Sequence, residues 1–201
     1  MGSLTKEQIA CWSKKYDDEE DLDNSNIEHE LGDKLRRTKE LSKDELKQII
    51  EWKFQGRLLG RRKRSLNIIS PIPDDFVKKV TREAFNEQDE GLRIRKLMGR
   101  YGGIAGVGPA LASVILTFYD PENYGVYDIH AWRELFGKDP ADLFTNFDQL
   151  MTFLARLKNE AKQMGCNVRI VEKAYYKKNL DESKAVRLPD TGRSTKFPRS
   201  C

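Results

Sequence analysis

The sequence has few cysteines, a small apolar share and no long apolar run. Its three cysteines among 201 residues show no C-x-x-C spacing, which argues against a four-cysteine zinc or iron–sulfur site. Apolar residues form 38% of the chain, below the roughly 45–50% that is typical of globular domains. We therefore expect part of the chain to lie in solvated arms.

The longest strongly apolar run, 110–119, falls short of the roughly 18 residues that a membrane span requires, so a spanning helix is excluded. The first residues, MGSLTKE, show no basic region followed by an apolar core, so no secretory signal is expected. These two absences predict an intracellular protein without a membrane partner.

Charge is present but unevenly distributed. The chain carries 36 Lys and Arg against 32 Asp and Glu, a formal net charge of +4. Residues 17–23 hold six acids and no base, whereas residues 53–64 hold six bases and no acid. Five of the fourteen glycines fall within 99–108. These three segments are therefore the first places in the chain to look for function.

Apolar residues recur at helical spacing along most of the chain, and no strand-type alternation appears, so the fold class is predicted to be all-α. Ser42 and Glu45 form a capping box, Pro109 suits a first helical position, and Asp128 suits an N-cap. The helices are expected at 43–56, 74–85, 89–98, 109–118, 129–136, 147–164 and 168–176.

Three regions are expected along the chain. Residues 1–31 are polar and acid-rich and are interpreted as a loosely ordered arm with at most short helices. Residues 32–180 form the helical domain, and residues 181–201 are interpreted as a flexible basic tail because the segment from 187 onward mixes Pro, Gly, Ser and basic residues.

The most specific feature is the segment IAGVGPALA at 104–112. Two glycines separated by one apolar residue let the backbone turn tightly and approach a ligand. The next helix is expected to begin at Pro109, so its free amides and positive dipole end point toward the turn, which favours a phosphate. Taken alone, this segment is also compatible with an ordinary turn between packed helices.

IAGVGPALA resembles the helix-hairpin-helix motif of DNA-binding proteins, and VYDIHAWR at 126–133 resembles a segment of the helix-hairpin-helix-GPD DNA glycosylase superfamily. Asp128 lies twenty residues after Gly108, close to the family's spacing between hairpin and catalytic aspartate. The resemblance is good over 98–136 and weak over 46–176. It implies a two-lobed helical fold and a DNA repair enzyme that hydrolyses the N-glycosidic bond of a damaged or mismatched base flipped from duplex DNA.

Residue by residue, the resemblance implies that Asp128 stabilises positive charge on the sugar or orients water. It implies that backbone amides in the hairpin hold a DNA phosphate and that nearby carbonyls hold a K⁺ or Na⁺ ion when DNA is bound. The amides belong to Gly106, Gly108 and Ala110, with Val107 between them, and the carbonyls belong to Gly102, Ile104 and Val107. No iron–sulfur cluster and no other cofactor are expected.

The chain departs from the family at Ala110, where members that also cleave the strand have a lysine. This substitution predicts a monofunctional glycosylase. One alternative is an abasic-site lyase that uses an amine from elsewhere, Lys53 or Lys96. The other is a helix-hairpin-helix DNA-binding module without catalysis.

With a DNA-binding motif nearby, the basic run is expected to contact phosphates rather than only solvent, and the chain is expected to act as a monomer on double-stranded DNA. The basic side chains concerned are Arg57, Arg61, Arg62 and Arg64. Aromatic residues usually form the core, but Tyr127 and Trp52 are the candidates for lining the flipped-base pocket.

Overall fold

The computed structural model describes residues 3–19, 22–55 and 59–187, and over these ranges the chain is helical without a strand. The all-α class is therefore confirmed. A single isolated bridge joins Met98 to Ile104. The helices are α1 (Lys6–Glu19), α2 (Leu22–Thr38), α3 (Lys43–Lys53), α4 (Leu59–Ile69), α5 (Asp74–Phe85), α6 (Glu90–Leu97), η2 (Gly99–Tyr101), α7 (Pro109–Tyr119), α8 (Ile129–Phe136), α9 (Phe147–Met164) and α10 (Val168–Arg187).

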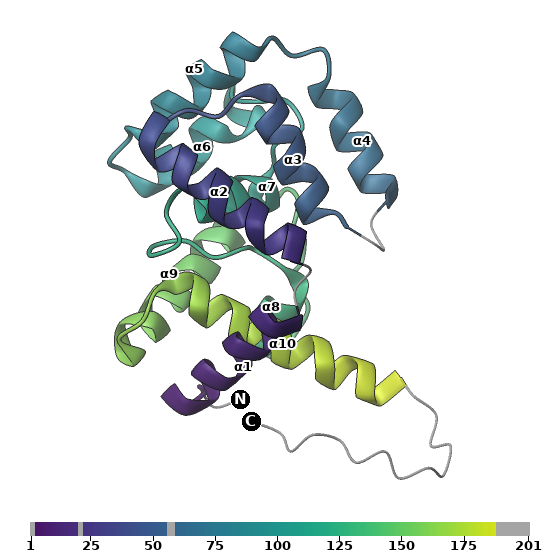
Figure 1. Ribbon diagram of the computed structural model, residues 1–201, viewed down its shortest axis with the longest axis vertical. Coiled ribbons are helices and arrows are strands. Elements are labelled where there is room, and N and C mark those ends of the chain that lie inside the picture. Colours follow the sequence, from purple (N-terminus) through teal and green to yellow (C-terminus); the bar gives the residue numbers. More distant parts are fainter. Residues whose placement is uncertain (1–2, 20–21, 56–58, 188–201) are drawn as a thin grey trace.

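The helices form two groups (Figure 1). The upper group contains α2 to α7, and the lower group contains α1, α8, α9 and α10. Helix α10 contacts α1, α8 and α9 within the lower group, and α7 contacts α2, α3 and α6 within the upper group. Helix α7 also contacts α9, so it connects the two groups.

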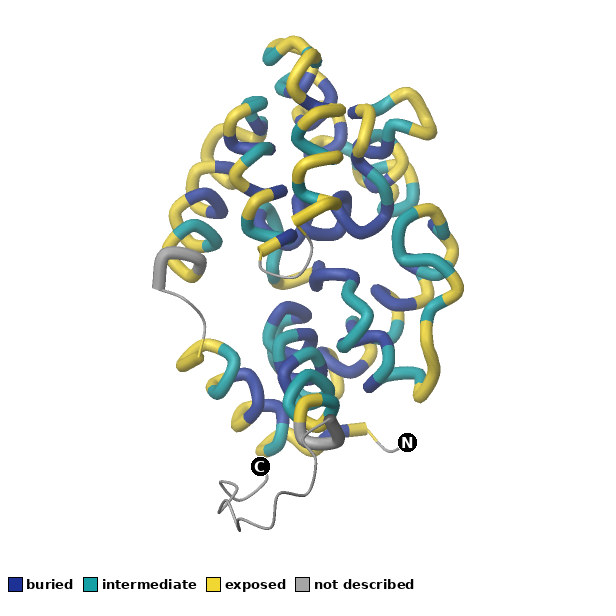
Figure 2. Tube along the Cα trace, turned by 90° about the vertical axis from the view of Figure 1, so that its right-hand side faces the viewer, coloured by how far each residue is buried: buried dark blue, intermediate teal, exposed yellow. Residues whose placement is uncertain are grey.

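The hydrophobic core runs through both groups. In α7 every residue from Pro109 to Phe118 is buried, which suits its position between the groups. Buried positions lie on the inward sides of the surrounding helices, while their outer sides are exposed (Figure 2). Helix α9 shows this pattern clearly, with Leu150, Phe153, Leu154 and Leu157 fully buried.

Local capping signals fix several helix ends. Ser42 and Glu45 make the predicted capping box at the start of α3. The side chain of Asp128 accepts a hydrogen bond from the backbone N–H of His130 and caps α8. The predicted bounds 74–85, 129–136 and 147–164 coincide with α5, α8 and α9.

The N-terminal segment differs from the expected loosely ordered arm. Residues 6–19 and 22–38 are two helices, and α1 packs along α10. Ile9, Trp12, Leu31 and Leu35 are buried. The few apolar residues of this segment lie on one side and find partners distant in sequence, so tertiary packing outweighs the polar composition.

Two further elements differ from the prediction. Residues 59–69 form α4, a segment where no helix is expected from the sequence. Helix α10 continues to Arg187, well past residue 176 and into the predicted tail. The rest of that tail, 188–201, lies outside the described residues.

Candidate functional site

The glycine-rich turn between α6 and α7 is built as its sequence suggests. Gly102 and Gly106 have φ angles of +88° and +86°, in the left-handed region that favours glycine. A Cβ atom on Gly103 would lie 2.2 Å from the carbonyl oxygen of Lys96. The turn therefore requires glycine at several positions, and Gly108 follows as the N-cap of α7.

The turn and α4 together line a groove of about 650 Å³. Gly106, Gly108 and Ala110 line one side, and Arg61 and Arg64 line the other. The first amides of α7 have no intrahelical acceptor, as at any helix start, and they belong to this region. The groove thus combines backbone donors with two guanidinium groups.

The basic side chains of α4 form no ion pair with a described residue, although Asp142 lies near enough to Arg61 to feel its charge. Within the described ranges, no carboxylate lies within ion-pair distance of Arg61, Arg62 or Arg64, and Arg61 stacks over the Phe144 ring at 3.7 Å from its centroid. Arg57 lies outside the described residues. Cations gathered along one helix without an ion-pair partner are an electrostatic arrangement that attracts a polyanion.

The basic residues of α10 show the opposite arrangement. The Nζ atom of Lys173 lies 2.8 Å from a carboxylate oxygen of Asp17, and Lys177 pairs with Glu19 and Asp181. The acids of the run 17–23 whose contacts are described therefore pair within α1 and with α10. They do not neutralise the described cations of α4.

Two of the candidate catalytic residues meet between the helix groups. The Nζ atom of Lys53, at the end of α3, lies 3.0 Å from Oδ2 of Asp128, at the start of α8. The side chains are 9% and 21% exposed, respectively. The pair is thus largely withdrawn from solvent and spans 75 residues of sequence.

Burial alone would raise the pKa of the Asp128 carboxyl group, but the charge of Lys53 and the hydrogen bond from the His130 backbone outweigh it. The pKa of Asp128 therefore lies below its ordinary value of 3.8. A lowered pKa keeps Asp128 ionised at neutral pH. The contribution of this carboxylate to stability is present above the ordinary pKa and is lost as the pH falls through the lowered value.

Lys53 and Asp128 line a small pocket of about 160 Å³. Its aromatic walls are Tyr16 of α1, Trp52 of α3 and Tyr176 of α10. The indole N–H of Trp52 is buried and has no hydrogen-bond partner among the described residues. The pocket is completed by Gln55, Val126, Arg169 and Glu172.

Sequence reasoning missed the contribution of α1 and α10 to this pocket. Arg169, Glu172 and Tyr176 follow one another at spacings of three and four residues, so they share a face of α10. That spacing, with charged residues on an otherwise packed helix, is the signal that could have identified them. Tyr16 carried no such signal, because it lies in a segment interpreted as an arm.

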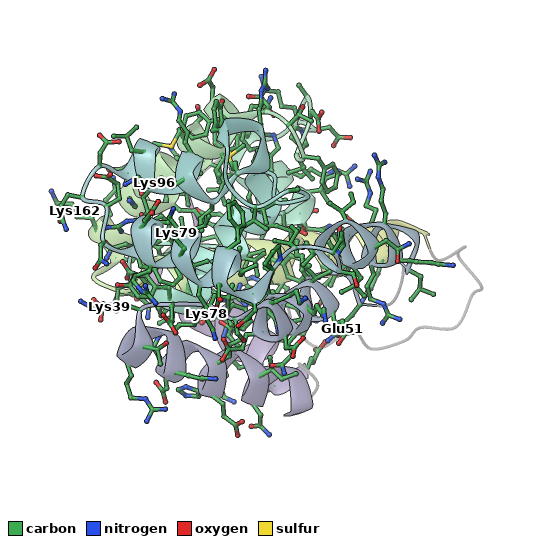
Figure 3. All side chains as sticks on the ribbon, turned by 90° about the horizontal axis from the view of Figure 1, so that it is seen from above. Lys39, Glu51, Lys78, Lys79, Lys96 and Lys162 are labelled. Atoms are coloured by element: carbon green, nitrogen blue, oxygen red, sulfur yellow. The ribbon has the colours of Figure 1, made fainter. Side chains whose placement is uncertain are left out.

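The other candidates are placed elsewhere. Tyr127 is fully buried in the core instead of lining the pocket, because its ring packs against Trp132 and Phe153. Lys96 pairs with Glu87 at 2.7 Å. Seen from above, Lys96 lies on the opposite side of the molecule from Glu51, which precedes Lys53 by two residues (Figure 3).

The predicted cation site would use main-chain oxygens of the hairpin. Two of them already accept backbone hydrogen bonds, Ile104 from Val107 and Val107 from Gly99, each at 3.0 Å. A carbonyl oxygen has a second lone pair, so the turn is compatible with the ion. Across the described part of the chain, no group of three or more His, Cys, Asp or Glu side chains is arranged to hold a metal.

Searches against protein-family models, curated proteins and solved structures give no match to this chain. No helix in the described ranges has the length and apolar character that crossing a membrane requires.

Proposed function

We propose that this chain is a DNA repair glycosylase that removes a damaged or mismatched base from double-stranded DNA and then acts as a lyase on the abasic site. The observation that carries the proposal is the 3.0 Å contact of Lys53 Nζ with Asp128 Oδ2 at the wall of a small pocket. This contact favours the lyase alternative over the monofunctional enzyme that Ala110 predicts.

The chemistry requires an amine and a carboxylate beside the sugar. As the bond between C1′ and the base breaks, positive charge develops on the deoxyribose, and the ionised Asp128 stabilises it. The base leaves with the bonding electrons and takes up a proton from the Lys53 ammonium, and the lone pair freed on Nζ then bonds to C1′. Ring opening gives a Schiff base, and loss of a C2′ proton breaks the bond to the 3′ oxygen.

The pocket suits a single flipped group. Tyr16, Trp52 and Tyr176 provide flat aromatic walls, and a planar base stacks on such rings regardless of its identity. Trp52 also offers a buried N–H donor without an acceptor among the described residues. Extrusion of the base costs about a few kcal/mol, and contacts with the DNA backbone offset part of this cost.

Those backbone contacts would come from the groove. Residues at the start of α7 line the same groove as Arg61 and Arg64. Such contacts fix the register of the protein on DNA without choosing a sequence. The groove thus supplies binding, and the Lys53 pocket supplies chemistry.

A second candidate function uses the same contact differently. Lys53 and Asp128 also satisfy each other as an ion pair between α3 and α8, and Asp128 caps α8. Were the pair purely structural, the chain would be a helix-hairpin-helix DNA-binding module without catalysis.

The two functions are separated by a panel of duplex oligonucleotides, each with one oxidised, deaminated, alkylated or mismatched base. We expect one class to be converted to a nicked product without heat or alkali. Release of the base without a nick would support the monofunctional enzyme, and binding of every duplex without product would support the non-catalytic module.

A further inference from the structure

A buried cluster of charges surrounds Arg169, which is 4% exposed. Its Nε and Nη2 atoms donate to the two carboxylate oxygens of Glu28, each at 2.8 Å. Nη1 pairs with Glu172, and Nη2 also donates to the Tyr16 hydroxyl oxygen at 3.2 Å. The guanidinium group therefore uses all three of its nitrogens.

The partners of this one group come from different helices. Glu28 belongs to α2, Tyr16 to α1 and Glu172 to α10 itself. The guanidinium carbon of Arg169 also lies 5.6 Å from the centroid of the Trp52 ring on α3. Because α2 and α3 belong to the upper group and α1 and α10 to the lower one, Arg169 joins the two groups (Figure 1).

The junction adjoins the pocket. Tyr16, Trp52 and Glu172 all line the same cavity as Lys53 and Asp128, and so does Arg169. Trp52 immediately precedes Lys53 in α3, so a shift of the α3 backbone that repositions Trp52 also repositions the lysine. The position of Lys53 relative to Asp128 thus depends on a contact made by α10.

The charged groups of the cluster interact strongly with one another. Although burial disfavours a charged Glu28, the Arg169 guanidinium lowers the pKa of Glu28 to about 2. Because the pair is bidentate, it fixes both the orientation and the distance of the Glu28 carboxylate relative to the Arg169 guanidinium group. Removing one member would leave a buried charge without compensation.

We propose that Arg169 is a positioning residue of the site: by clamping Glu28, Tyr16 and Glu172 against Trp52, it sets the distance between Lys53 and Asp128. The inference about rate rests on the proposed function, whereas the inference about position does not. It also makes α1 and α2 part of the site instead of an arm.

The test compares Arg169→Met and Arg169→Lys with Lys177→Met. Lys177 is a matched control, because it is a buried cation of the same helix that pairs with Glu19 of α1 and does not line the pocket. Trapping of the Schiff base by borohydride on abasic duplex DNA gives the rate at saturating DNA. Fluorine NMR of 5-fluorotryptophan protein reports on the environment of Trp52 without requiring activity, with Trp52→Phe as the assignment control.

We expect Arg169→Met to lower the trapping rate about 30-fold with DNA affinity unchanged, since a misplacement near 1 Å can cost about 100-fold. Arg169→Lys should recover part of the rate. The Trp52 resonance should shift in Arg169→Met, and Lys177→Met should match the wild type in both measurements.

A wild-type rate together with an unshifted Trp52 resonance in Arg169→Met would overturn the inference. Equal losses in Arg169→Met and Lys177→Met would also overturn it, because they would indicate general destabilisation. If the wild type forms no adduct at all, the proposed function fails, and the Trp52 resonance still decides the positioning role. Should Arg169→Met not fold, Glu28→Gln replaces it, with the same expected shift and the same overturning result.

Discussion

The glycine hairpin and the Lys53 pocket are two regions of one candidate site, yet they are built in different ways. The hairpin is made by consecutive residues, 99–110, whose backbone conformation is dictated locally. The pocket is assembled from α1, α3, α10 and the start of α8, with residues as far apart as Tyr16 and Tyr176. A binding feature can thus be encoded in a short segment, whereas the proposed chemistry requires the whole fold.

The comparison is most informative at Ala110. This position follows the hairpin and lines the α4 groove, whereas Lys53 and Asp128 line the smaller pocket. Position 110, where the sequence resemblance would place a lysine, and Lys53 therefore line separate cavities. Under the proposed function, the hairpin contacts DNA and Lys53 of α3 supplies the amine.

The largest expected effect is that of Lys53→Ala. Loss of the nucleophile should reduce borohydride-trapped adduct on abasic duplex DNA to the background level, since no other described lysine lines the pocket. Lys47→Ala is the matched control, because Lys47 lies on the same helix and pairs with Asp44 at 2.9 Å. Adduct formation that survives in Lys53→Ala but falls in Lys96→Ala would assign the amine to Lys96.

A lysine introduced at position 110 should not rescue that loss. In Lys53→Ala/Ala110→Lys, the new side chain starts from a residue that is 3% exposed and opens into the other cavity. We expect adduct to remain within about threefold of Lys53→Ala, because an amine outside the reacting geometry contributes little. Recovery to wild-type trapping would mean that the two cavities act as one.

Asp128→Asn should reduce base release about 100- to 10,000-fold, the usual range for losing a catalytic carboxylate. DNA affinity should stay within about threefold, because asparagine still caps a helix well and can accept the His130 N–H. Single-turnover base release and equilibrium binding give the two values. Base release at the wild-type rate would remove Asp128 from the mechanism.

Glycine substitutions test the local character of the hairpin. Gly103→Ala places a Cβ atom against the Lys96 carbonyl and should cost about 2 kcal/mol or more of unfolding free energy. Gly60→Ala, on α4, meets nothing within 4 Å and should add about 0.5–1 kcal/mol. Urea denaturation of both variants measures the contrast, and equal values would contradict a hairpin determined by backbone geometry.

The smallest effect is expected at α4. Neutralising Arg61, Arg62 and Arg64 to Gln should flatten the dependence of log K on log salt by about 0.9 for each DNA phosphate that the variant no longer neutralises. Lys173→Gln and Lys177→Gln, whose cations are paired on α10, should leave the slope unchanged. An unchanged slope in the arginine variant would indicate that the α4 arginines face only solvent and do not contact DNA phosphates.

Much of the fold could be predicted from local signals. The bounds of α5 follow from its apolar period. Those of α8 and α9 also follow from their capping residues, because the side chains of Asp128 and Asn146 each accept a hydrogen bond from a backbone N–H of the first turn. The N-terminal helices could not be predicted in this way. Their apolar residues, such as Ile9 and Trp12, are too few to indicate a helix until α10 provides a surface for them.

The candidate site, too, could be predicted from the sequence only where local signals determine it. Asp128 and the hairpin follow from motif spacing, but the partner of Asp128 does not, because Lys53 reaches it only through the packing of α3 between α2 and α7. Trp52 lies in the pocket, whereas Tyr127 lies in the core. Sequence alone ranks aromatic residues by proximity to a motif and cannot tell which way a ring points.

The central claim is that Lys53 is the amine that attacks the sugar. The most direct measurement is to trap wild-type protein on abasic duplex DNA with borohydride and to identify the modified peptide by mass spectrometry. The account predicts one adduct, on the Nζ atom of Lys53. An adduct on another lysine, or no adduct under conditions where the protein binds the DNA, would contradict it.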